Sequence, residues 1–218
     1  YKMNNLDTLI SNSPISRFNN KGYFIKIDKK NKLNLLKEKI IKINNYETKK
    51  KGMNIIFSDG NIDSQIMIIG DFSKAKNDER EVPFMGPEGE LLDKMLHAIN
   101  LDRSNVYITN VINYKLPNDK KLDYKEIKKN IPYLLEHIEI INPKILILLG
   151  EIALQSIIGN EANIFKQRGV WFKKKINNNS IDIMATFHPA FLIKQTEQKI
   201  YSWNDLKLVR EKIKFIKI

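Results

Sequence analysis

The sequence predicts an α/β fold: a single-domain three-layer sandwich in which helices cover both faces of a central, mostly parallel four-stranded sheet. Four short apolar runs support this prediction, because strands buried on both faces lack the alternation of apolar and polar residues. Segments with helical spacing separate these runs, and strands that alternate with helices are typical of a parallel sheet. The chain has 218 residues, enough to bury a large core.

The predicted elements follow one another without an internal repeat or a low-complexity linker. The predicted strands are 64–71, 105–113, 144–150 and 181–188, preceded by a shorter apolar run, 54–61, that ends in a turn signal. The predicted helices are 31–45, 86–100, 122–142, 151–159 and 201–216. Helix 86–100 begins near Pro87, and Pro132 predicts a kink or a restart within 122–142. We divide the chain into an N-terminal polar segment and helix, 1–45, and a main domain, 46–218.

Composition restricts the classes of protein and partner. The net charge of +12 favours a polyanionic partner, first nucleic acid and then an acidic membrane surface, although a Lys- and Asn-rich composition is an equally good explanation. The absence of cysteine excludes disulfides, thiolate metal sites and cysteine nucleophiles. No apolar run approaches the roughly 20 residues that span a bilayer, and no secretory signal is visible. We therefore expect a cytoplasmic protein.

The residues that follow the predicted strands are the candidates for a site. Parallel sheets bind ligands beyond the carboxyl ends of their strands. These positions hold Gly70-Asp71, Thr109-Asn110, Gly150-Glu151 and Phe187-His188-Pro189. An acid, an amide and an imidazole are thus expected to meet on one rim of the sheet.

Seven motifs between about 54 and 207 resemble those of the uracil-DNA glycosylase superfamily, and within it the iron–sulfur branch called family 4. In chain order they read "PFMGPEGELLDKML", "VYITNVI", "EIKKNIPYLL", "NPKILILLG", "RGVWF", "TFHPAFLIK" and "KIYSWNDL". The resemblance implies a monofunctional hydrolase of base excision repair. Such an enzyme turns uracil out of single- or double-stranded DNA and cleaves its N-glycosidic bond. The implied protein acts as a monomer.

The chain departs from the family at two places. Alignment puts the four cysteines that hold the family's cluster near Ile43 and at Tyr46, Tyr114 and Asn130, and none of these residues supplies a thiolate. We therefore expect no cluster and no other metal or cofactor. The first motif is also altered to "GDFSKAKND", in which Gly70 is kept and Asp71 replaces a glutamate.

The resemblance implies a role for each candidate, and an ordinary structural role stands beside each. Phe84 would stack on the turned-out uracil beside Gly70, or would simply pack in the core. Asn110 would pair with uracil O4 and N3–H, or would end a strand. His188 would stabilise the negative charge on the leaving base, or would be structural. Asp71 would position water and balance charge on the sugar, or would cap a turn or helix, with Asp78 as an alternative acid.

The resemblance also implies the DNA contacts. "PAFLIK" would form a loop in which Pro189 fixes the exit from the strand, Leu192 and Ile193 wedge into the base stack, and Lys194 meets phosphate. A second contact is expected at "KLPNDKK", which includes Lys115 and Pro117. Further candidates for phosphate contacts are Lys74, Lys76 and Arg168.

Two other functions remain open. The first is a catalytically weak or inactive DNA-binding relic of the family, because the first motif is altered. The second is an unrelated basic α/β protein that binds nucleotides. The sequence contains neither of the glycine-rich phosphate-binding patterns that would support this reading.

Overall fold

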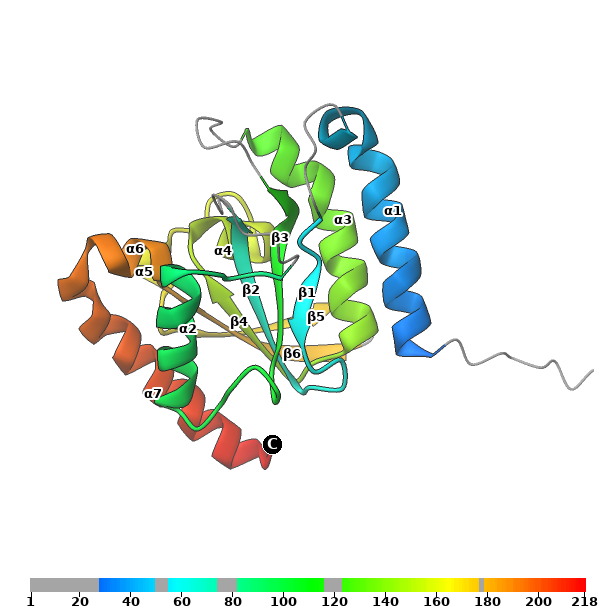
Figure 1. Cartoon of the computed structure of the whole chain (residues 1–218). Coiled ribbons are helices and arrows are strands. Elements are labelled where there is room, and N and C mark those ends of the chain that lie inside the picture. The colour runs from blue at the N-terminus through cyan, green and yellow to red at the C-terminus, as the bar shows by residue number, and fades with distance from the viewer. Residues whose placement is uncertain (1–27, 50–54, 74–81, 116–122, 177–178) are drawn as a thin grey trace, which may run out of the picture.

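The computed structural model describes residues 28–49, 55–73, 82–115, 123–176 and 179–218. A six-stranded sheet runs through its centre in the order β1-β3-β2-β4-β6-β5 (Figure 1). The four inner strands are mutually parallel, and both edge strands are antiparallel to their neighbours. The strands are β1 (Ser58–Gly60), β2 (Ile66–Ser73), β3 (Tyr107–Lys115), β4 (Ile145–Leu149), β5 (Trp171–Ile176) and β6 (Asn179–Thr186).

The predicted α/β class and the mostly parallel sheet are confirmed, but four strands was an undercount because the two edge strands were missed. β1 is only three residues long and reads as a turn. β5 has the sequence WFKKKI, in which three successive lysines hide the apolar pattern. Lysine is common on edge strands, where it discourages pairing with another chain.

Helices cover both faces of the sheet. Figure 1 shows α3, backed by α1, on one side and α2 and α7 on the other. The helices longer than one turn are α1 (Lys29–Lys49), α2 (Pro87–His97), α3 (Tyr124–Ile141), α4 (Glu151–Ile158), α6 (Pro189–Lys194) and α7 (Lys199–Ile216). A four-residue helix, α5 (Ile164–Gln167), and a 3-10 turn, η1 (Thr196–Gln198), complete the described elements.

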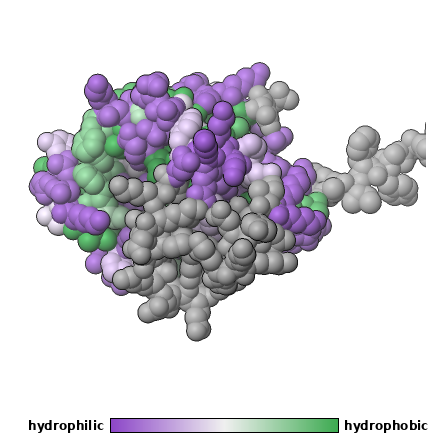
Figure 2. Space-filling model, turned by 90° about the horizontal axis from the view of Figure 1, so that it is seen from above, coloured by the Kyte–Doolittle hydropathy of each residue, from purple (hydrophilic) through white to green (hydrophobic). Residues whose placement is uncertain are grey.

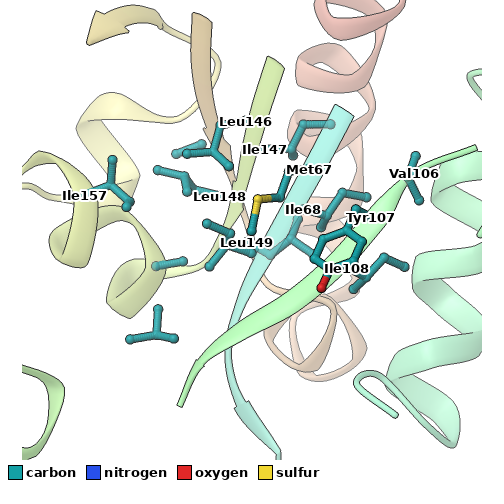
Figure 3. Close-up of a cluster of buried hydrophobic side chains, with 14 of the residues drawn as sticks. Met67, Ile68, Val106, Tyr107, Ile108, Leu146, Ile147, Leu148, Leu149 and Ile157 are labelled. Atoms are coloured by element: carbon teal, nitrogen blue, oxygen red, sulfur yellow. The ribbon is translucent and has the colours of Figure 1, made fainter. Parts of the chain in front are cut away.

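The core lies between the inner strands and the helices. Figure 3 shows side chains of β2, β3 and β4 packed together with Ile157 of α4. The side chains of β4 are buried along its whole length, as the continuous apolar run predicts. Among the described residues no helix is long and apolar enough to cross a membrane.

Two helices differ in detail from the prediction. The N-terminal helix extends beyond 31–45 and buries Leu33, Leu36 and Ile40 against the core, so α1 is docked on the main body rather than apart from it. α3 neither ends nor restarts at Pro132, which lies inside it. Asn130 also lies in α3, and its side chain hydrogen-bonds the Glu126 carbonyl one turn earlier.

Candidate active site at the carboxyl ends of the parallel strands

Gly70 lies between two of the predicted site residues. β2 and β3 pair in parallel with Gly70 opposite Asn110, which brings the Asn110 amide next to the Gly70 α-carbon. The Phe84 ring approaches the same atom. A methyl group on Gly70 would lie 2.6 Å from Asn110 Oδ1 and 2.7 Å from Phe84 Cε2. Both distances are far inside van der Waals contact, so only glycine permits this arrangement.

The Asn110 amide is nearly buried, but the fold does not use its hydrogen-bonding groups. The residue is 2% exposed, and its amide makes no hydrogen bond to any residue that the structure describes. Every fully buried side-chain nitrogen or oxygen in those residues has a partner, so the amide must retain contact with solvent. By contrast, Thr109 and Asn113 on the same strand both donate to the Phe57 carbonyl. Asn110 can therefore offer a donor and an acceptor to the edge of a ligand.

The backbone around Phe84 is held in an uncommon conformation. Phe84 has a φ of 57°, in the left-handed region that bulky residues rarely adopt. Its carbonyl accepts a hydrogen bond of 2.7 Å from Arg103 Nη2. The first turn of α2 crosses so closely that a methyl group on Gly89 would lie 2.7 Å from the Phe84 carbonyl carbon. Arg103 and Gly89 together fix the segment that presents the ring.

Sequence reasoning missed Arg103, which is the centre of a small charge network. Its Nη1 lies 2.7 Å from Asp59 Oδ2, and its Nε lies 2.8 Å from Asp93 Oδ1. The same guanidinium also donates to the carbonyls of Pro83 and Phe84. The partners come from three separate parts of the sequence, so no local motif indicates the network.

His188 is the N-cap of α6, with Pro189 as the first helical residue. Its Nδ1 accepts a hydrogen bond of 3.1 Å from the Ala190 N–H, so in the neutral ring Nε2 carries the proton. Burial lowers the pKa of His188 to about 4, which keeps the imidazole neutral at pH 7. The ring stacks against Phe84, with 5.4 Å between centroids. His188 therefore presents a neutral N–H donor beside the Phe84 ring.

Asp71 is placed both to cap a helix and to face the cleft, and its catalytic role stays a prediction. One oxygen, Oδ1, accepts a 2.9 Å hydrogen bond from the Ala153 N–H in the first turn of α4, as a capping acid would. Asp71 also lines the cleft that contains His188. Burial, together with the charges of Glu151 and Glu88, raises the pKa of Asp71 to about 7 against the opposing effect of backbone N–H groups. Near pH 7 the carboxyl can therefore exchange a proton.

A cleft of about 430 Å³ is lined by Asp71 and His188, whereas Phe84 and Asn110 lie beside it and do not line it. Glu88, in the first turn of α2, faces it together with Asp71 and His188, and sequence reasoning missed its role. The only local signal was the acidic first turn of the helix. The lining residues are Asp71, Phe72, Pro87, Glu88, His188, Ala190, Phe191, Ile193 and Lys194.

The segment "PAFLIK" is a short helix, not the predicted loop, because proline starts α6 and His188 caps it. The predicted two-residue wedge is corrected as a result. Leu192 is 1% exposed and belongs to the core, since it lies on the inner side of α6. Ile193 is 41% exposed and lines the cleft with Lys194. Of the two apolar residues, only Ile193 projects from the surface.

The remaining predicted DNA contacts fall into two groups. Arg168 is not a free phosphate contact, because its guanidinium pairs with Asp205 and lies over the Phe187 ring. Lys115 ends β3, but its side chain lies outside the described part of the chain. Pro117, Lys74, Lys76 and the alternative acid Asp78 also lie outside the described residues.

The residues at the implied cluster positions do not fit an iron–sulfur cluster. The chain has no cysteine to supply a thiolate. The Tyr114 hydroxyl instead donates to Glu126 Oε1 at 2.7 Å, and Asn130 Nδ2 donates to the Glu126 carbonyl at 2.8 Å. No group of three or more His, Cys, Asp or Glu in the described residues is arranged to hold a metal ion. The side chains of Ile43 and Tyr46 lie outside the described set.

Comparisons with known proteins agree with the resemblance. A family model described as the uracil DNA glycosylase superfamily matches residues 57–207. Three curated relatives carry the name "Type-4 uracil-DNA glycosylase". The protein of Thermotoga maritima is 31% identical over 67% of this chain and 76% of its own length. The protein of Sulfurisphaera tokodaii is 30% identical over 82% of this chain and 84% of its own length. The protein of Pyrobaculum aerophilum is 30% identical over 65% of this chain and 74% of its own length.

Proposed function

The chain belongs to the uracil DNA glycosylase superfamily, and from this premise we propose that it hydrolyses the N-glycosidic bond of uracil in DNA. It is a glycosidase of DNA repair that acts on a base turned out of the stack. One observation carries the assignment to this site. The Phe84 ring and the Asn110 amide converge on the Gly70 α-carbon, and we expect the uracil slot there, with the ring as its wall and the amide as its polar edge.

In this slot, Phe84 stacks on the uracil ring and Asn110 reads its edge. The amide N–H of Asn110 donates to uracil O4, and the amide oxygen accepts from N3–H. Cytosine presents the reverse pattern and would leave polar groups unpaired. Arg103 and Gly89 support base selection indirectly, because they fix the segment that carries Phe84.

His188 stabilises the leaving base. As the bond between N1 and C1′ breaks, negative charge develops on uracil O2 and positive charge on the sugar. The Nε2–H of a neutral His188 donates to O2, and this interaction strengthens with the developing charge. The proposed role requires no protonated histidine, in agreement with a pKa of about 4.

Asp71 in its ionised form balances the positive charge at C1′ and holds the water that attacks it. Glu88 adds negative potential from across the cleft. Water adds to C1′, and its proton passes to Asp71 or to solvent. No metal, cluster or nucleotide enters this scheme.

DNA reaches the cleft over a basic surface. Ile193 fills the gap in the stack, Lys194 meets phosphate, and Pro189 fixes the start of the helix that carries both. Lys115 and Pro117 contribute a second contact. The protein acts as a monomer in the cytoplasm. With a net charge of +12, binding should weaken steeply with salt.

Asn110→Asp is the sharpest test. The change replaces an amide donor by an acceptor, so the bond to uracil O4 is lost and uracil release should fall by about 10²-fold or more. Release from uracil-containing single- and double-stranded oligonucleotides under single-turnover conditions measures the effect, and Asn113→Asp on the same strand is the control. An unchanged rate for Asn110→Asp would show that Asn110 does not bind the base. Wild-type protein that binds these strands but releases no uracil would instead be a DNA-binding relic.

A further inference from the structure

Phe165 is an exposed aromatic side chain that the reaction does not use. It lies on α5 and is 64% exposed. Two rings hold it edge-on: Phe187 at 5.3 Å between centroids with 60° between planes, and Phe191 at 5.9 Å with 85°. The Phe165 ring is therefore fixed by neighbours that touch its sides, and most of its surface faces solvent.

One neighbour of Phe165 lines the cleft, and the other adjoins a cleft residue in the sequence. Phe187 directly precedes His188, and Phe191 lines the cleft. The start of α5 is also tied to the first turn of α4, because the Ile164 N–H donates to Glu151 Oε2 at 2.7 Å. Figure 1 shows α5 and α6 beside each other. Phe165 thus extends the cleft wall outward by one side chain.

The surroundings of Phe165 suit a nucleic acid. Lys166 follows it on α5 and Lys194 ends α6; both are exposed, and neither forms an ion pair with any described residue. Figure 2 shows apolar side chains gathered with hydrophilic ones toward the left edge, the side on which Figure 1 places α6. An exposed ring with lysines on its own helix and on the neighbouring one suits single strands, whose bases stack on aromatic groups and whose phosphates meet cations.

We propose that Phe165 stacks on an unpaired base of the DNA strand, a neighbour of the nucleotide that enters the cleft. The inference rests on the proposed function, because it needs a strand in the cleft. A single strand can turn a neighbouring base toward the ring, whereas a duplex keeps that base stacked on its own neighbours. Phe165 accordingly gives the protein a preference for single-stranded or locally opened DNA.

The test measures binding of a 15-nucleotide single strand that contains one 2′-fluoro-deoxyuridine, which resists hydrolysis, by fluorescence anisotropy. Phe165→Ala and Phe165→Leu should each weaken binding about tenfold, while Phe165→Trp should retain it. The loss on the matching duplex should be less than twofold. Phe215→Ala is the matched control, since Phe215 is 83% exposed near the C-terminal end of α7, which Figure 1 places far from α5.

A scan of abasic sites locates the stacked base. Removing one flanking base at a time should weaken binding by the wild-type protein at one position only, and Phe165→Leu should be insensitive to that same removal. The proposal is overturned if the variant keeps wild-type affinity, or if every abasic position acts equally on both proteins. It is also overturned if Phe165→Ala changes only the oligomeric state, because the ring then belongs to an interface between copies.

Uracil release by the wild-type protein separates the two failures. If the wild-type protein releases uracil but the Phe165 variants bind DNA as well as it does, only the stacking site is refuted. No release and no binding by the wild-type protein refutes the proposed function itself.

Discussion

Two buried histidines show how the cleft differs from the rest of the molecule. Burial lowers the pKa of both, to about 3 for His137 and about 4 for His188. His137, on α3, has its Nε2 2.6 Å from the Tyr107 hydroxyl and its ring stacked on Phe57 at 4.7 Å. The Nε2 of His188 has no hydrogen bond to any described residue. Their pKa values are similar, but Nε2 is hydrogen-bonded to the Tyr107 hydroxyl in His137 and has no partner among the described residues in His188.

The same contrast holds between the two regions. Around α3, Tyr114 and Asn130 both hydrogen-bond Glu126, at its carboxylate and its carbonyl. At the carboxyl-end site, the Asn110 amide beside Gly70 is unpaired among the described residues, and the pKa of Asp71 in the cleft is raised to about 7. Burial alone therefore does not mark a site. Unused hydrogen-bonding capacity and an unfavourable charge mark it, because a fold satisfies polar groups wherever function does not need them.

The largest expected effect separates the two histidines. His188→Ala should lower single-turnover uracil release about 10²- to 10³-fold, the usual consequence of losing one donor to a developing anion. Its free energy of unfolding should fall by only about 1 kcal/mol, because the side chain that caps α6 is lost. His137→Ala should do the reverse, with a loss of roughly 2–4 kcal/mol in stability and a nearly normal rate for the folded fraction. Urea unfolding measures the stability of both variants, and uracil release from oligonucleotides measures their rates. Equal losses of rate in the two variants would contradict the distinction between the two histidines.

Asp71→Asn should lower the rate about 10²-fold while making the fold more stable at alkaline pH. The folded-state pKa of Asp71, about 7, lies above the reference value of 3.8, so its ionisation destabilises the fold increasingly between these values and fully above pH 7. Asparagine keeps an acceptor for the Ala153 N–H and carries no charge. We expect a gain on the order of 2 kcal/mol at pH 8 that disappears toward pH 4.

The rate of the wild-type protein should in turn rise with pH and level off above about 7, and this dependence should vanish in Asp71→Asn. Asp205→Asn is the control, because Asp205 already pairs with Arg168 and Thr186, so its loss should reduce stability. A pH profile unchanged by Asp71→Asn would assign the titration to another group.

Arg103→Lys should have an intermediate effect, about tenfold on kcat/KM, because one ammonium cannot replace the fork that holds Asp59, Asp93 and the Phe84 carbonyl. If Arg103 acts by positioning Phe84, the double variant with Phe84→Ala should be no slower than Phe84→Ala alone. Additive losses would give Arg103 only a general structural role. Lys212→Met, which removes a 2.9 Å ion pair with Asp182, is a matched control.

The smallest expected effect concerns α6. Ile193→Ala should slow release from duplex DNA a few-fold and leave release from single strands unchanged, because a single strand has no stack to open. Leu192→Ala should instead destabilise the protein by about 2–4 kcal/mol, since Leu192 is part of the core. An equal effect of Ile193→Ala on both kinds of strand would contradict the wedge.

The sequence was sufficient to predict the inner sheet, because its strands are continuous apolar runs whose burial does not depend on distant residues. It also singled out Asn110 and His188, although Asn110 lies within β3 and not beyond its end, and the roles of both residues stay predictions. The inward turn of Leu192 was not predictable, because that orientation depends on the helix that Pro189 and His188 start. Arg103 was missed for the same reason: its partners meet only after the chain has folded.

Gly70, next to both the Phe84 ring and the Asn110 amide, also determines how the site tolerates amino-acid substitution. Most positions tolerate a graded series of substitutions, from mild to severe. Gly70 has no mild substitution, because every other amino acid adds at least a methyl group where Asn110 Oδ1 would lie 2.6 Å away. In a library of all single substitutions scored for DNA repair, every variant of Gly70 should therefore lose activity. Variants of Asp71 and Glu88 should instead range from mild to severe.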